Sequence, residues 1–145
     1  MSGARAFLAR LRRDSRGAAI IEFAVLAPLV IGLMLGVLQV GIAMQAQNSL
    51  RSIAAETARY AVVQYQKDLT PNNAAIETQA RSIATSSPFN LKNTVTVRVT
   101  DAATQRVTGA LEKTMVITYT VPSVLPLFNW ASPTISHTRP IFVLD

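Results

Sequence analysis

The chain has 145 residues, half of them hydrophobic, and a formal net charge of +6. This length accommodates one small domain and an anchor, but not two full domains. Cysteine is absent, which excludes disulfides, thiol nucleophiles and zinc sites built on cysteine. Packing or neighbouring chains must therefore hold the domain together.

A basic leader is predicted for residues 1–17, where Asp14 is the only acidic residue. Its basic residues are Arg5, Arg10, Arg12, Arg13 and Arg16. The other nine basic residues are scattered among seven acidic ones, without the positive stripe that tracks phosphates, so no nucleic-acid partner is expected. Arginines beside a span favour the cytoplasmic side, which places residues 45–145 outside.

An apolar run covers residues 23–44 and contains one polar side chain, Gln39. About 20 residues suffice to cross a bilayer, so the run predicts a transmembrane helix. Pro28 predicts a bend or a loosened turn. Gly32 and Gly36 have the spacing that lets a second helix approach, although glycine is also common in membrane helices generally.

A secretory signal peptide is the alternative interpretation of the leader and the apolar run. Its apolar core usually has about 7–15 residues, which is shorter than this run. Cleavage near Ala43 would then release a soluble binding module.

The same helix is expected to continue beyond the membrane, and we assign residues 18–66 to it. Residues 45–65 lack proline and glycine. Their apolar side is a stripe at helical spacing formed by Leu50, Ile53, Ala54, Thr57 and Ala61. Charged residues fall largely off this stripe: Arg51, Glu56 and Arg59.

Residues 67–145 are predicted to form an extracytoplasmic α+β domain. Thr70 and Pro71 suit a helix start, and a short helix is expected over 73–85. Alternation with a period of two then predicts antiparallel strands, connected by residues 101–112. The alternating apolar residues are Val95, Val97 and Val99, then Met115, Ile117, Tyr119 and Val121. A third strand over 134–143 is placed at an edge because Pro140 interrupts it.

An apolar, proline-bearing loop is predicted for residues 122–133. Its large side chains are Val124, Leu125, Leu127, Phe128 and Trp130. They either fold over the sheet as core or form a patch for a partner subunit or the membrane surface.

Catalysis is not expected of this chain. His137 is its only histidine and has no acidic residue near it in sequence, so we interpret it as a surface residue. The acidic residues have no metal-ligand or paired-carboxylate spacing, and no phosphate-binding glycine loop is present. The sequence therefore predicts no catalytic residue, metal, cofactor or small-molecule substrate.

Glu22 stands at the edge of the apolar run, five residues after Gly17. A charge at a helix centre in a membrane costs about 2.5–3.5 kcal/mol, and less near the interface. Cleavage between Gly17 and Ala18 would create an ammonium group that could pair with Glu22 of a neighbouring chain. The alternative is that Glu22 merely caps the positive end of a helix at the interface.

Residues 16–29, Arg-Gly-Ala-Ala-Ile-Ile-Glu-Phe-Ala-Val-Leu-Ala-Pro-Leu, resemble the opening of the TadE-like family of tight-adherence (Tad, Flp) pilus systems. Residues 54–61, Ala-Ala-Glu-Thr-Ala-Arg-Tyr-Ala, resemble its second, less specific motif. The resemblance implies a pilin-like fold and a minor pilin or pseudopilin used in pilus assembly, adhesion and biofilm formation. The chain is far longer than the major Flp pilins, which favours a minor, tip or priming role.

The resemblance also implies partners and site residues. A prepilin peptidase would cut after Gly17, with Ala18 as the new N-terminus, and Glu22 with Phe23 would serve recognition and assembly. Pro28, Gly32 and Gly36 are the candidate helix-packing residues. The expected partners are other pilin subunits and the Tad assembly platform of the inner membrane. An uncleaved single-pass anchored protein is the other alternative.

Overall fold

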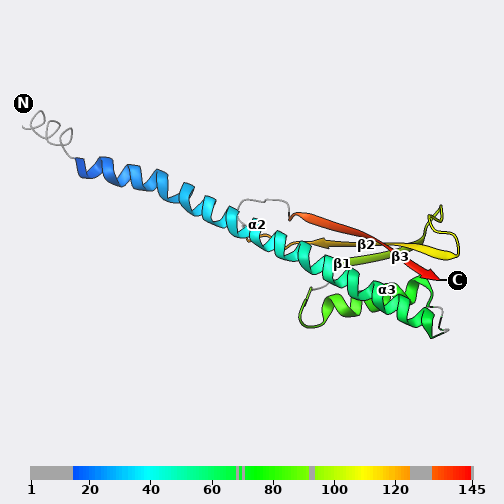
Figure 1. Cartoon of the computed structure of the whole chain (residues 1–145). Coiled ribbons are helices and arrows are strands. Elements are labelled where there is room, and N and C mark those ends of the chain that lie inside the picture. The colour runs from blue at the N-terminus through cyan, green and yellow to red at the C-terminus, as the bar shows by residue number, and fades with distance from the viewer. Residues whose placement is uncertain (1–14, 68, 70, 92–93, 125–131, 145) are drawn as a thin grey trace, which may run out of the picture. The chain divides into compact units, whose positions relative to one another are not determined.

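A computed structural model of the chain describes residues 15–67, 69, 71–91, 94–124 and 132–144 (Figure 1). Within these residues it contains two helices and three strands: α2 (Ser15–Gln66), α3 (Asn73–Thr85), β1 (Val95–Asp101), β2 (Ala110–Thr120) and β3 (Thr134–Leu144). The predicted α+β class, with a long first helix, a short second helix and an antiparallel sheet, is confirmed.

Three sequence-based expectations fall wholly or partly outside the described residues: most of the leader, the cap at Thr70 and the centre of the apolar loop, residues 125–131. The described chain forms two compact units that divide within α2, Met1–Leu38 and Gln39–Asp145. The proposed limits of leader, helix and domain at residues 17 and 66 remain predictions.

The second half of α2 packs against the core of the second unit. Its predicted stripe is confirmed, because all five members are fully buried: Leu50, Ile53, Ala54, Thr57 and Ala61. Arg51, Glu56 and Arg59 are exposed, as the helical spacing requires. Burial of one face stabilises this half of the helix more than helix propensity alone could.

The sheet has the strand order β1-β2-β3, and both pairings are antiparallel. One face supplies the core residues Val95, Val97, Val99, Met115, Ile117, Tyr119, Ile141 and Val143. β3 lies at an edge, as predicted, and Pro140 stands opposite Thr114 in the register. An edge strand accommodates proline because it pairs with one neighbour only, so the missing N–H removes no hydrogen bond to a second strand.

Helix α3 spans Asn73–Thr85, which confirms the helix predicted over 73–85, but its N-cap is Asn72, so Pro71 is not its first residue. Asn72 is the N-cap, and its Oδ1 accepts a hydrogen bond from the Ala75 N–H at 2.8 Å. Ile76, Ala80 and Ala84 face the core. A helix start is decided by which side chain reaches the free N–H groups, and here asparagine does so.

The connection between β1 and β2 is shorter than the predicted 101–112. Residues 110–112 belong to β2 because they pair with β3, opposite residues 142–144. Glu112 is buried, and its carboxylate accepts hydrogen bonds from Arg106 Nε at 2.8 and 3.0 Å. These hydrogen bonds from Arg106 hold the pKa of Glu112 below its usual value. Glu112, which the sequence pattern placed in the loop, thus belongs to β2 and stabilises the turn through Arg106.

Thr57 has a fully buried hydroxyl without a hydrogen-bond partner in the described part of the chain. A buried unpaired hydroxyl costs about 1–3 kcal/mol, and valine has nearly the same shape without this cost. We therefore expect Thr57→Val to stabilise the domain by about 1 kcal/mol in chemical denaturation of the detergent-solubilised chain. Thr78→Val is the control, because that hydroxyl already donates to the Ala74 carbonyl at 2.8 Å. A loss of stability in Thr57→Val would show that the hydroxyl is used.

Candidate functional site: the apolar half of helix α2

The apolar half of α2 is the candidate site because it contains every residue predicted for cleavage, assembly or helix packing. In the described part of the chain, this helix is long and apolar enough to cross a membrane. Its large side chains between residues 20 and 38 are mostly exposed, with Phe23 73% and Ile20 69% exposed, while Leu35 is half-buried. A soluble protein rarely exposes such a surface, so it requires lipid or other protein around it.

Gly17 and Ala18 lie within helix α2, which the structure describes from Ser15 onward. The bond between them is therefore in helical backbone. A peptidase that takes its substrate extended must first unwind this end. Glycine weakens a helix by about 1 kcal/mol relative to alanine, so Gly17 lowers the cost of that unwinding.

Glu22 follows Ala18 by four residues, which places both on one side of the helix. Its side chain is exposed, and no described residue forms an ion pair or hydrogen bond with it. Phe23 is exposed beside it. Among the described residues, Glu22 is thus a carboxylate without a partner, followed by apolar side chains.

Pro28 lies within α2, and the helix continues through it. The predicted bend at this residue stays a prediction. Gly32 and Gly36 are one turn apart, and a Cβ added to either would meet nothing within 4 Å. Neither glycine is therefore required by the packing of this chain on itself.

Replacing Gly36 by leucine tests whether this face packs against another helix. The unbound chain has open space there, so we expect its stability to be unchanged. Association with pilin subunits should fall about tenfold, as expected for 1–2 kcal/mol of lost interhelical contact, measured by cross-linking in membranes. Gly41→Leu is the matched control, because Gly41 also faces open space but lies about 140° around the helix. Equal effects of both substitutions would contradict a specific packing face.

Gln39 forms a contact that the sequence analysis did not predict. Its Nε2 donates to the carbonyl of Pro122 at 3.2 Å, and its Oε1 accepts from the N–H of Val124 at 2.9 Å. Both hydrogen-bonding ends of the amide are thereby used by one backbone segment. The sequence did offer one signal, because Gln39 is the one polar side chain in the 22-residue run 23–44.

His137 is half-buried, which corrects its interpretation as a surface residue. It stands opposite the buried Ile117 in the register and so shares the core-facing side of the sheet. No group of three or more metal-binding side chains occurs among the described residues.

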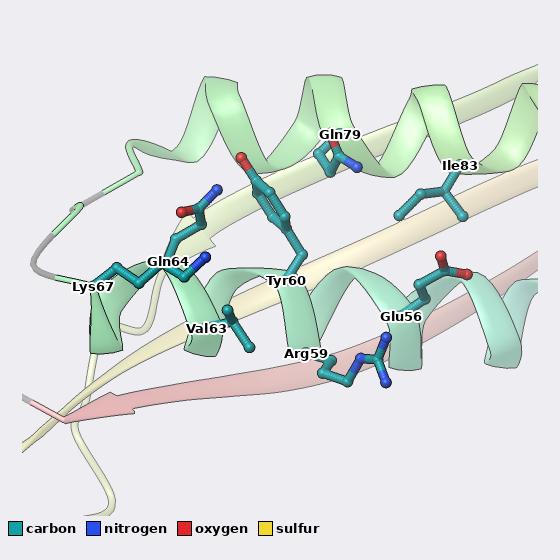
Figure 2. A pocket seen from close by; sticks show the side chains of 8 residues that line it. All are labelled: Glu56, Arg59, Tyr60, Val63, Gln64, Lys67, Gln79 and Ile83. Carbon is teal, nitrogen blue, oxygen red and sulfur yellow. The ribbon is translucent and has the colours of Figure 1, made fainter.

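A groove of about 310 Å³ lies between α2 and α3 (Figure 2). Tyr60 extends from α2 toward α3 in this view, beside Gln79. Its lining is mixed in charge and polarity and consists of Glu56, Arg59, Tyr60, Val63, Gln64, Lys67, Gln79 and Ile83. The groove lies in the second unit, and three of its lining residues, Glu56, Arg59 and Tyr60, belong to the second motif at residues 54–61.

Together these features define a class of protein, namely a small α+β domain that continues from a helix able to anchor it in a membrane. Residues 17–59 match the family model described as TadE-like protein, which confirms the predicted resemblance. The match begins at Gly17, the second residue of the first motif, and ends at Arg59, within the second motif. The family is a structural one that serves pilus systems, and the match with the apolar helix fits a Tad pilus-related membrane protein. Comparisons with curated proteins and with solved structures found no match.

Proposed function

We propose that this protein is a minor pilin or pseudopilin of a Tad/Flp pilus. It is inserted in the inner membrane through α2, with the N-terminus in the cytoplasm and the α+β domain outside. A prepilin peptidase cuts between Gly17 and Ala18, and the shortened chain then takes part in pilus assembly and surface adhesion. The proposal gives the chain a structural role and no catalytic one.

One observation supports this proposal most strongly. The family match starts at Gly17, and the apolar half of the helix that follows carries Glu22 and exposes most of its large side chains. A helix with this much uncovered apolar surface gains stability in lipid first and against neighbouring helices later. Its partners are therefore the peptidase, other pilin subunits and the assembly platform in the inner membrane.

The pairing of Glu22 supplies a reason for assembly. A new ammonium group at Ala18 of one subunit and Glu22 of its neighbour neutralise each other, which lowers the cost of holding either charge in the membrane. Within one subunit the two groups lie one turn apart on the same side. A neighbour displaced along the helix axis can therefore present its amine to this carboxylate.

The experiment that tests this function is the identity of the mature N-terminus. We would measure intact mass and terminal sequence of the protein purified from membranes of cells that carry the peptidase. A start at Ala18 supports pilin-type processing. A start at Met1 contradicts it and favours the uncleaved anchor, and a start near Met44 favours a secreted module released by signal peptidase.

The same mass measurement in cells without the peptidase is the control. The chain should then retain its leader and remain in the membrane fraction. Cleavage after Gly17 in those cells would mean that another enzyme processes the chain.

A further inference from the structure

The sheet of the second unit has two edges, and its hydrogen bonds determine which backbone groups point outward at each. The N–H of Val121 donates to the carbonyl of Pro133 at 2.9 Å, which continues the register of β2 with β3. Hydrogen-bonded pairs alternate in an antiparallel ladder, so the odd-numbered residues of β3 pair with β2. The N–H and C=O groups of its even-numbered residues therefore point away from the sheet.

At the β1 edge, a helix side chain occupies an outward-pointing donor. The N–H of Ala102 donates to the Glu112 carbonyl at 2.9 Å, so the even-numbered residues of β1 pair with β2 and Val99 does not. Helix α3 packs against β1, and its Glu77 accepts a hydrogen bond from the Val99 N–H at 2.7 Å. A carboxylate thus takes a backbone donor that a further strand would need.

The β3 edge is open. No described residue forms a hydrogen bond with the outward N–H groups of Ser136 and Thr138. Pro140 is the next even-numbered residue, so its nitrogen also points outward but offers no donor. An open edge can pair with a further strand, and proline limits how far that pairing extends. Residues 134–138 are therefore the part of this edge that can form a ladder with another chain.

A groove of about 380 Å³ lies between α2 and the next residues of β3, 139–142. Its lining includes the apolar side chains of Val62 and Ile141 and two arginines, Arg59 of α2 and Arg139 of β3. Both arginines are exposed, neither forms an ion pair with a described residue, and the lining contains no acidic residue. The groove therefore suits a carboxylate next to an apolar side chain, because guanidinium groups bind carboxylates through charge-assisted hydrogen bonds.

We propose that the open edge of β3 binds an extended, acidic segment of another pilus subunit by strand addition. The backbone of residues 134–138 supplies the ladder, which gives affinity, and the groove beside Arg139 takes the carboxylate, which gives specificity. This inference rests on the proposed function, which supplies the neighbouring subunits. It names the surface through which one of them is bound.

A second copy of this chain is a poor occupant of the edge. From Thr134 to Leu144, β3 carries Arg139 and no acidic side chain. Two such edges side by side would bring like charges together, which destabilises cross-strand pairs. The β1 edge of a second copy already has Glu77 on one of its donors. The occupant is therefore a different chain that contributes negative charge.

Two synthetic peptides test this chemistry on the full, detergent-solubilised chain. One is acetyl-Thr-Val-Thr-Val-Glu-Val-Thr-amide, and the other has lysine in place of glutamate. Hydrogen exchange resolved to single amides reports where they bind. We expect the glutamate peptide to slow exchange of the Ser136 and Thr138 amides and to bind about tenfold more tightly than the lysine peptide. Equal affinities, or protection confined to other strands, would overturn the proposal.

Thr138→Pro removes one outward N–H and is the decisive variant. We expect the glutamate peptide to bind about tenfold more weakly, because one hydrogen bond is lost and its acceptor is left unpaired. Thr138→Val is the matched control, since it changes the side chain but keeps the N–H, and its binding should be unchanged. Circular dichroism verifies the fold of both variants, and unchanged binding by well-folded Thr138→Pro would overturn the proposal.

Arg139→Glu tests the groove without altering the backbone. We expect this variant to lose the preference for the glutamate peptide over the lysine peptide. Arg98→Glu is its control, because it reverses the charge of an exposed arginine on β1, and it should retain the preference. A preference that persists in Arg139→Glu would contradict the role of the groove.

Measurements in piliated cells separate this inference from the proposed function. Thr138→Pro should reduce the number of surface pili, while its mature chain still starts at Ala18. Normal piliation in this variant would overturn the inference alone. A start at Met1 in the unaltered chain would instead contradict the proposed function, whatever the peptides do.

Discussion

Gly17→Leu is expected to leave the protein uncleaved, with the leader still attached in membranes that contain the peptidase. The bond after Gly17 lies in helical backbone, because α2 begins at Ser15. Leucine favours the helix by about 1 kcal/mol over glycine and adds a side chain where an extended backbone must enter an active site. A misplacement of about 1 Å at a reacting bond can cost a hundredfold in rate, so we expect at least that loss.

Gly17→Ala separates the two contributions to this loss. Alanine favours the helix as strongly as leucine does but has a small side chain, so an intermediate cleavage rate is expected. Time courses followed by intact mass would compare the three chains. Normal processing of Gly17→Leu would mean that residue 17 does not enter the peptidase, and the predicted cleavage position would then be wrong.

Glu22→Gln is expected to permit cleavage but to reduce pilus assembly by at least about tenfold. Glutamine keeps the shape of glutamate but has no charge to pair with the amine of a neighbouring Ala18. An uncompensated charge in the membrane costs roughly 2.5–3.5 kcal/mol, and 1.4 kcal/mol already corresponds to a factor of ten. Surface pili and the mature N-terminus should be measured in the same cells, so that assembly and processing are scored separately.

Two variants control for the chemistry of this substitution. Glu22→Asp retains the charge and should preserve part of the assembly. Glu56→Gln removes an exposed carboxylate from the same helix outside the apolar run and should leave assembly unchanged. Normal piliation in Glu22→Gln would contradict the pairing of charges and favour the alternative in which Glu22 only caps the helix end.

Much of the fold could be predicted because it follows from periodicity along the chain. The stripe that includes Leu50 and Ile53 repeats with the helical period and is fully buried. The valines of β1 occur at every second position, which is the period of a strand, and all of them face the core. A helix or strand must bury its apolar side, so the pattern determines both its type and its inward face.

Element ends and the roles of isolated polar residues were predicted less well. Asn72 caps α3 and β2 extends to Ala110 because of particular hydrogen bonds. Local composition does not determine which of these hydrogen bonds form. Glu112 is buried because Arg106 reaches it from the turn, which no periodicity encodes. His137 was misjudged because its face is set by register with β2.

By itself, the sequence determined the long apolar helix, the α+β class, the inward faces and the TadE-like motif at residues 16–29. These depend on local pattern and on residue chemistry at fixed spacing. Only the tertiary structure decided what Gln39 does, because its two partners lie more than 80 residues away. A polar side chain in an apolar run must find hydrogen bonds, but the folded chain alone determines which backbone supplies them.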